Sequence, residues 1–185
     1  HVMKTSIVSV CKYSLADNAH LIQKVESTYN AAFPPVERRD FSLVVDLLSS
    51  NSRFFLDVLM DPVGYIGFIT YWDSESFIYI EHFAIDEKRR NSGLGGKALH
   101  TFLQKVDKPI LLEVEPPVDK EQIRRIAFYN RYGFEYHSLP YKQPPYRMGD
   151  PMLPMCLMSF GDIPFINDIQ KIKTILYQNV YNWYE

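Results

Sequence analysis

Cysteine is scarce in this sequence, and the two cysteines present show no pairing or metal-binding pattern. Cys11 and Cys156 lie far apart in the chain, with no CxxC spacing. Cys156 stands in an apolar segment, where a small buried hydrophobic side chain is favoured over a reactive nucleophile. This usage of cysteine favours a reduced, intracellular protein, for which we expect a cytoplasmic location and no metal site.

The sequence also lacks a long apolar run and an excess of charge of one sign. No apolar run approaches the roughly 18 residues that a membrane-spanning helix needs, and no signal peptide is visible. Twenty basic residues stand against twenty-two acidic ones, which gives a formal charge of -2. This balance favours neither nucleic acid nor a membrane surface as a partner.

What is present is enough apolar material for one packed domain. The chain has 185 residues, of which 46% are hydrophobic and 23% charged, so we expect a single domain over residues 1–185. Apolar runs predict strands over residues 4–10, 53–59, 65–71, 77–85, 109–114, 134–137 and 155–160. Apolar residues spaced by three and four predict helices over residues 17–33 (with Asp17 as N-cap), 41–48, 120–132 and 163–183, and a further helix after Gly96. This order of elements is typical of a mixed α/β sheet.

Glycine is scarce as well, with eight in the chain, yet three of them stand within four residues. Gly93, Gly95 and Gly96 follow an apolar strand and a basic turn at residues 88–90, and they lead into a helix. The first turn of a helix has backbone N–H groups without intrahelical partners and the positive end of the helix dipole. Glycines let an anion approach those groups closely. This stretch is therefore predicted to bind a phosphate group.

The spacing Arg90-x-x-Gly93-x-Gly95 resembles the acyl-CoA loop of the GNAT superfamily of N-acetyltransferases. A second stretch supports the resemblance, because residues 127–134 (AFYNRYGF) are similar to a later helix of that family. That helix carries a tyrosine four residues before a terminal Gly-Phe pair. Two linked matches in the right order are more specific than either match alone.

The resemblance implies a GNAT-like acyl-CoA N-acyltransferase fold, in which a central, mostly antiparallel sheet of about seven strands is flanked by helices. This acetyltransferase core would cover residues 4–160, and residues 161–185 would form a C-terminal helical extension. Apolar residues recur in that tail at steps of three and four, as in an amphipathic helix. The apolar side of the helix would either cover the chain's own core or hold a homodimer together, and the sequence leaves both open.

Acetyl-CoA is the cosubstrate that the resemblance implies, and no metal ion is implied with it. Its pyrophosphate would lie on the glycine loop. Its pantetheine arm would pair with the backbone of the preceding strand, where an N–H group stabilises the oxyanion. The residues implied in cofactor binding are Phe83, Ala84, Ile85, Arg90, Asn91, Ser92, Gly93, Leu94, Gly95, Gly96 and Asn130. One departure from the family is Arg124, which stands where an asparagine is frequent.

The implied reaction transfers the acetyl group to a primary amine of a small molecule or a peptide. An amine with a pKa of about 10.4 is protonated at neutral pH, so the reaction needs a base. Glu81 interrupts an apolar strand, and the family often places a glutamate there to act through water. Burial would raise its pKa towards the working range. The alternative is a structural carboxylate paired with a neighbouring cation such as His82.

The departing thiolate needs a proton or a hydrogen-bond donor. The resemblance assigns this role to the tyrosine one helical turn before Gly133, which is Tyr129. A packed ring with its hydroxyl at the surface is the alternative for Tyr129, and neighbouring Tyr132 is not expected to take part. The acceptor amine would bind between the loops over residues 33–39 and 139–153, each of which contains at least one aromatic residue.

Two other functions stay open. The glycine loop, extended to Ala98, also fits a relaxed dinucleotide fingerprint, and Glu113 falls where a ribose-binding acid is expected. The residues between strand and loop, and the antiparallel strands before them, argue against such a dinucleotide-binding oxidoreductase. A nonenzymatic acyl-CoA-binding module would keep the glycine loop, while Glu81 and Tyr129 would be structural.

Overall fold

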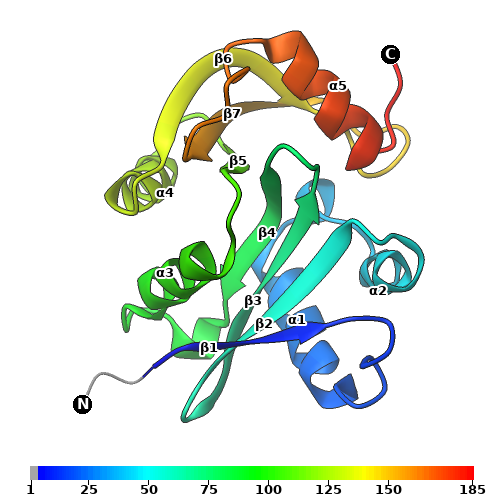
Figure 1. The fold of residues 1–185 in the computed structure, drawn as a ribbon, viewed down its shortest axis with the longest axis vertical. Coiled ribbons are helices and arrows are strands. Elements are labelled where there is room, and N and C mark those ends of the chain that lie inside the picture. Colours follow the sequence, from blue (N-terminus) through cyan, green and yellow to red (C-terminus); the bar gives the residue numbers. More distant parts are fainter. Residues whose placement is uncertain (1–3) are drawn as a thin grey trace. The chain divides into compact units, whose positions relative to one another are not determined.

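The structure is a computed structural model that describes residues 4–185 of the chain (Figure 1). Two short 3-10 helices, Pro35–Glu37 and Glu87–Arg89, accompany the longer elements. In chain order these are β1 (Ser6–Val10), α1 (Ala19–Ala32), α2 (Phe41–Ser50), β2 (Phe54–Asp61), β3 (Gly64–Asp73), β4 (Ile78–Ile85), α3 (Leu94–Lys105), β5 (Ile110–Val114), α4 (Lys120–Arg131), β6 (Glu135–Gln143), β7 (Leu153–Phe160) and α5 (Ile169–Asn179).

The strands form one seven-stranded sheet in the order β1-β2-β3-β4-β5-β7-β6. The pairs β1/β2, β2/β3, β5/β7 and β6/β7 are antiparallel. The pair β4/β5 is parallel and joins residues 78–80 to residues 110–112. The predicted mixed α/β sheet, mostly antiparallel and flanked by helices, is therefore confirmed.

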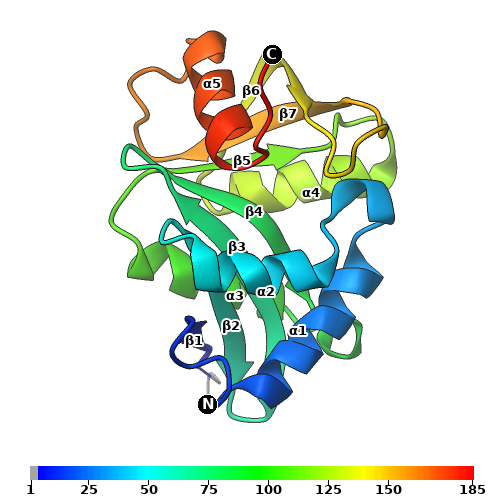
Figure 2. The ribbon, with the colours of Figure 1, turned by 90° about the vertical axis from the view of Figure 1, so that its right-hand side faces the viewer.

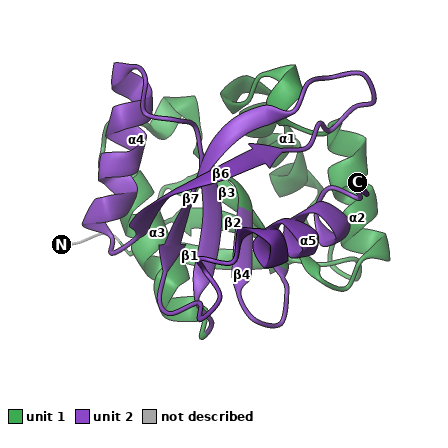
Figure 3. Ribbon diagram, turned by 90° about the horizontal axis from the view of Figure 1, so that it is seen from above, with its two compact units in different colours: residues 1–72, 81–107 green, residues 73–80, 108–185 purple. Residues whose placement is uncertain are grey.

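Two compact units make up the chain, and each is described on its own (Figure 3). The first unit holds the residues up to 72 and residues 81–107, and the second holds residues 73–80 and 108–185. The division runs through β4, so the predicted base and the segment predicted to pair with the cofactor belong to the first unit. The prediction of one domain over residues 1–185, with a core over residues 4–160, stays a prediction.

In the first unit, α1 and α2 cover one face of the strands and α3 covers the other (Figures 1 and 2). The helices form because their apolar residues recur every three or four positions, which gives each helix an apolar face to bury. The core between these layers is apolar and aromatic, with Val25, Val44, Val58, Phe68 and Phe102 all at most 1% exposed. This packing supports the strand and the loop that carry the candidate site.

In the second unit, α4 and α5 lie on opposite sides of the strands β5, β7 and β6 (Figure 3). The apolar side of α5 is buried within the chain, since Ile172 and Leu176 are fully buried and Tyr177 is 4% exposed. Of the two alternatives for the tail, the structure therefore favours the one in which the helix covers the chain's own core. No helix among residues 4–185 has both the length and the apolar character needed to cross a membrane.

Several predicted boundaries are wrong, and three of them have a clear structural reason. α1 begins at Ala19, and its N-cap is Asn18 rather than Asp17, because a series of turns precedes the helix. β6 continues to Gln143, well into the segment predicted as a loop over residues 139–153, because that segment pairs with β7.

The third wrong boundary is the start of α5, which was predicted at Ile163. The helix begins six residues later, at Ile169. The side chain of Asp168 caps it by accepting a hydrogen bond from the backbone N–H of Lys171 at 3.2 Å. Ile163 lies in a turn before the helix and is still buried, at 2% exposure. Apolar periodicity therefore identified the buried residues correctly and the helix start incorrectly.

Candidate active site

The predicted anion-binding loop connects β4 to α3. Gly93 is the N-cap of α3 with a φ of +75°, and Asn91 also has a positive φ, of +65°. A Cβ added at Gly93 would meet no atom within 4 Å, so backbone conformation rather than space requires glycine there. Gly95 and Gly96 lie in the first turn of α3 itself. No side chain caps this turn, so its N–H groups can donate hydrogen bonds to an anion.

A hollow of about 400 Å³ lies beside this loop. Its lining residues are Asp61, Lys88, Arg89, Arg90, Ser92, Leu94 and Lys97. Asp61 forms an ion pair with Arg89. Burial raises the pKa of the Asp61 carboxyl, but the hydrogen bonds from Arg89 and from two backbone N–H groups outweigh burial and lower that pKa. The charges of Asp61 and Arg89 cancel within this ion pair. Lys88, Arg90 and Lys97 therefore make the hollow positive, which fits a ligand that carries phosphate groups.

From Glu81 on, β4 alternates between two environments, as successive side chains of a strand do. His82 and Ala84 are buried, while Phe83 and Ile85 are half-buried. Glu81 is exposed through its backbone only, because its side chain is 1% exposed. β4 also approaches β3 very closely, because a Cβ added at Gly67 would lie 2.2 Å from the carbonyl oxygen of Ala84. Only glycine permits this approach. The backbone position of the segment predicted to pair with the cofactor therefore depends on Gly67.

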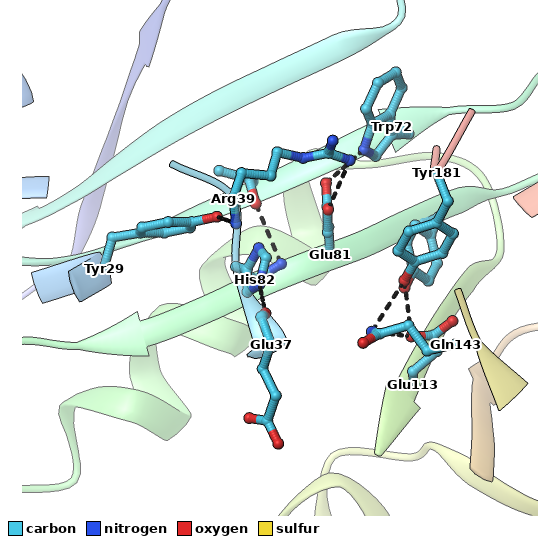
Figure 4. Close-up of polar contacts among 11 residues, drawn as sticks. Tyr29, Glu37, Arg39, Trp72, Glu81, His82, Glu113, Gln143 and Tyr181 are labelled. Carbon is cyan, nitrogen blue, oxygen red and sulfur yellow. Dashed lines mark hydrogen bonds and ion pairs between the residues drawn. The ribbon is translucent and has the colours of Figure 1, made fainter. Parts of the chain in front are cut away.

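Glu81 accepts two hydrogen bonds within the first unit (Figure 4). Its Oε1 accepts from Nε1 of Trp72 at 2.8 Å, and its Oε2 accepts from Nη2 of Arg39 at 2.9 Å. The Glu81 side chain is 1% exposed and that of Arg39 is 14% exposed. Both donors stabilise the ionised carboxylate. The cation that pairs with Glu81 is therefore Arg39 and not the His82 that the sequence suggested.

His82 is directed away from Glu81 and holds the loop before α2 (Figure 4). Its ring lies edge-on to those of Tyr29 and Phe33, with centroid distances of 5.0 and 4.6 Å. Its Nε2 lies 2.8 Å from the backbone carbonyl oxygen of Glu37, and because a carbonyl can only accept, Nε2 carries the proton. Burial lowers the pKa of His82, so the ring is neutral at neutral pH.

Tyr129 lies in α4 of the second unit, one helical turn before Gly133. It is 8% exposed, and burial raises the pKa of its hydroxyl to about 12. The hydroxyl therefore stays protonated and can donate a hydrogen bond. Among residues 4–185, no hydrogen bond engages it. Tyr132 is only half-buried and Asn130 is exposed on the same helix.

The predicted site residues fall into both units. Glu81, the segment 83–85 and the loop 90–96 belong to the first unit, whereas Tyr129 and Asn130 belong to the second. Within the first unit, Glu81 and the segment 83–85 share one strand, and that strand leads into the loop. The assembly of these residues into one active site stays a prediction.

The carboxylate of Glu113, a half-buried residue of β5, lies at the centre of a polar cluster in the second unit (Figure 4). It accepts hydrogen bonds from the hydroxyls of Tyr141 and Tyr181, the latter at 2.8 Å, and from Nε2 of Gln143 at 2.7 Å. Tyr181 also bonds to the hydroxyl of Tyr79 at 2.7 Å. Burial raises the pKa of Glu113. A ribose-binding acid must be open to its ligand, so this enclosure argues against the dinucleotide alternative.

Comparison with known proteins identifies the family. The model of the Acetyltransferase (GNAT) family matches residues 20–134, which is more than half of the chain. This chain belongs to the GNAT acetyltransferase family. A curated relative, "Putative acetyltransferase YjbC" of Bacillus subtilis (strain 168), is 32% identical over 115 residues. These residues are 60% of this chain and 57% of the relative, so the chain spans little more than half of that protein's length.

Solved structures show the GNAT fold over nearly the whole chain. A structure named "Putative acetyltransferase from GNAT family from Bacteroides thetaiotaomicron" is 34% identical with a TM-score of 0.90, covering 97% of this chain and 99% of that one. Arabidopsis thaliana Naa50 in complex with the bisubstrate analogue CoA-Ac-MVNAL is 17% identical with a TM-score of 0.57, covering 86% and 99%. The second likeness concerns the fold alone. The predicted family and GNAT-like fold are confirmed.

Proposed function

We propose that this protein is an N-acetyltransferase that transfers the acetyl group of acetyl-CoA to a primary amine of a small molecule or a peptide. The observation that carries the proposal is the positively charged hollow beside the uncapped first turn of α3. Acetyl-CoA supplies an acetyl group that is activated as a thioester. The residues of this chain would bind it, remove a proton from the amine and assist the departing sulfur.

The loop residues 90–96 would hold the phosphate groups of the cosubstrate. Arg90 donates its Nε to the carbonyl oxygen of Ile85 at 3.0 Å, which fixes the start of its guanidinium beside the end of β4. Ser92 similarly donates to the carbonyl oxygen of Arg89 at 2.9 Å, which fixes the turn before α3. The backbone of residues 83–85 would pair with the pantetheine arm, and the exposed Asn130 would add a polar contact from α4.

Glu81 is the proposed base, acting on the amine through a water molecule. Its two donors hold the carboxylate ionised, so it can accept a proton at neutral pH. An ion-paired carboxylate is a weak base, so the transfer of the amine's proton to Glu81 through water would be an unfavourable equilibrium that precedes the attack. Glu81→Gln should lower turnover and leave CoA affinity nearly intact, whereas unchanged turnover across pH would make Glu81 structural.

Tyr129 is the proposed hydrogen-bond donor to the departing sulfur. Its hydroxyl has a pKa of about 12, whereas an ordinary thiol has a pKa of about 8.5. Full proton transfer from this hydroxyl to a thiolate would therefore cost roughly 5 kcal/mol. A hydrogen bond that stabilises the developing negative charge is the more favourable role.

The acceptor class rests on the chemistry that the family performs and on two loops, the one between α1 and α2 and the one after β6. The bisubstrate analogue bound to Naa50 joins CoA to a peptide, which supports including peptide α-amines among the acceptors to be tested. Residues 33–39 and the loop after β6 remain the proposed acceptor side. A homodimer stays a prediction, and no surface of the described residues is assigned to it.

Thermal unfolding with CoA, followed by turnover of acetyl-CoA with a panel of amines, tests the proposal. CoA at about 100 times its Kd should add about 2.7 kcal/mol to the free energy of unfolding, which raises Tm by roughly 5–11 °C. Gly95→Glu should abolish this rise, because a carboxylate would enter the anion site. Absence of CoA binding at millimolar concentration would contradict the proposal, and stabilisation by NAD(P) instead would favour an oxidoreductase. CoA binding without turnover of any amine would indicate the nonenzymatic module.

A further inference from the structure

The loop between α1 and α2 is fastened within the first unit at three points close together in sequence. The carbonyl oxygen of Glu37 accepts from His82 at 2.8 Å. The backbone N–H of Arg39 donates to the hydroxyl of Tyr29 at 2.8 Å, and its side chain reaches Glu81 at 2.9 Å. Two of these attachments fix the backbone beside Arg39. Its guanidinium is therefore delivered to Glu81 from a fixed position.

Trp72 completes this arrangement, which we call the Glu81 clamp and which consists of Arg39, Trp72 and Glu81 (Figure 4). The guanidinium carbon of Arg39 lies 6.0 Å from the centre of the Trp72 ring, so the two donors to the carboxylate also contact each other. Neither an indole N–H nor a guanidinium can accept a hydrogen bond. Each oxygen of Glu81 therefore meets a donor that favours the ionised form and fixes its direction.

Two side chains beside the clamp, those of Tyr29 and His82, are neutral. Burial raises the pKa of Tyr29 and lowers that of His82. Both side chains are therefore uncharged at neutral pH, although the negative charge of Glu81 acts on each of them. Arg38 points to the loop backbone and donates its Nε to the carbonyl oxygen of Phe33 at 2.8 Å. Arg39 thus supplies positive charge in direct contact with the carboxylate.

We propose that Arg39 is a positioning residue for Glu81: it holds the carboxylate ionised and in one orientation, and it links the loop on the acceptor side to the base. Its role in catalysis rests on the proposed function. The clamp itself is a property of the free protein. A shift of Arg39 would change the direction and the proton affinity of Glu81 together, so the loop could not move without affecting the base.

The indole N–H of Trp72 provides a direct readout, because it donates to the carboxylate under study. The chain has two tryptophans, so a ¹⁵N-labelled sample gives two indole signals, and Trp183→Phe identifies that of Trp72. In the wild type this signal should stay constant from neutral to mildly acidic pH and titrate only at low pH. In Arg39→Gln the midpoint should move to higher pH, because the carboxylate loses its cation.

The kinetic readout is the pH profile of kcat/KM with the best amine of the panel. Arg39→Gln should lower kcat/KM roughly 10- to 100-fold at neutral pH through misplacement of the base and should move the acidic limb to higher pH. Arg39→Lys keeps the charge but not the planar fork. Arg39→Lys should therefore keep the acidic limb of the pH profile near that of the wild type and still lower kcat.

Lys105→Gln is the matched control, because it breaks another buried ion pair of the first unit. Lys105 lies 2.6 Å from Asp57, whose side chain is fully buried. This variant should lose stability and leave both the Trp72 titration and the acidic limb unchanged.

The proposal would be overturned if the Trp72 indole signal of Arg39→Gln titrated at the same pH as in the wild type, or if the acidic limb of its pH profile did not move. If Arg39→Gln does not fold, Arg39→Lys decides, and wild-type kcat for that variant would refute the orienting role. A wild-type protein that acetylates no amine would refute the proposed function, while the Trp72 titration would still test the clamp.

Discussion

Replacing Gly67 by alanine is expected to lower stability and weaken CoA binding together. The added Cβ would lie 2.2 Å from the carbonyl oxygen of Ala84 and 3.0 Å from Cα of Ile85, whereas ordinary contacts begin at 3.4 Å. Both atoms belong to the backbone, so no side-chain rotation relieves the overlap, and β4 must move away from β3 by about 1 Å. Overpacking of this kind costs about 1–3 kcal/mol. At about 2–4 °C per kcal/mol, Tm should fall by roughly 2–12 °C.

Urea unfolding would measure the loss of stability, and calorimetry would measure the affinity for CoA. CoA binding should weaken because the displaced segment around Ala84 is the one proposed to pair with the pantetheine arm. Gly149→Ala is the control, since a Cβ there meets no atom within 4 Å and only the positive φ of +94° is penalised. It should leave CoA affinity unchanged. Wild-type stability and CoA affinity for Gly67→Ala would refute the argument from the close approach of the two strands.

Four further variants test the second unit. Tyr129→Phe should lower kcat by about 10²- to 10⁴-fold with CoA affinity nearly unchanged, and Tyr132→Phe should do little; equal kcat for Tyr129→Phe and wild type would remove Tyr129 from the mechanism. Because burial raises the pKa of Glu113, the wild type should lose stability as pH rises through that raised value. Glu113→Gln should flatten this slope in urea unfolding, and identical slopes would contradict it. Deletion of residues 169–185 should expose the surface that α5 covers and lower Tm, whereas an unchanged Tm would show that α5 is dispensable for the core.

The parts of the site that the sequence could predict are those that depend on short motifs of neighbouring residues. The glycines at the start of α3 and the position of Tyr129 one turn before Gly133 follow from spacings within a few residues. Strand alternation likewise explains the opposite directions of Glu81 and His82. Each of these depends on backbone geometry that repeats over one turn or one pleat.

The parts that sequence could not predict depend on distant partners. Arg39 and Glu81 are 42 positions apart, and no local pattern marks Arg39 among the charges of its loop. The same holds for the cluster around Glu113, whose donors come from β6 and from beyond α5. Sequence singled out Glu81 as an unusual carboxylate within an apolar strand, but its partner could only be named once the fold brought the two segments together.

The hydrogen bond between Tyr79 and Tyr181 also sets an order for folding during synthesis. The two residues are separated by 102 positions, and both belong to the second unit. Every residue of the first unit has been synthesised once position 107 is reached, whereas the second unit cannot complete its buried cluster until Tyr181 has left the ribosome. Compact units tend to fold as they emerge from the ribosome. We therefore expect the anion-binding loop to be folded before residues 73–80 can pack against the rest of the second unit.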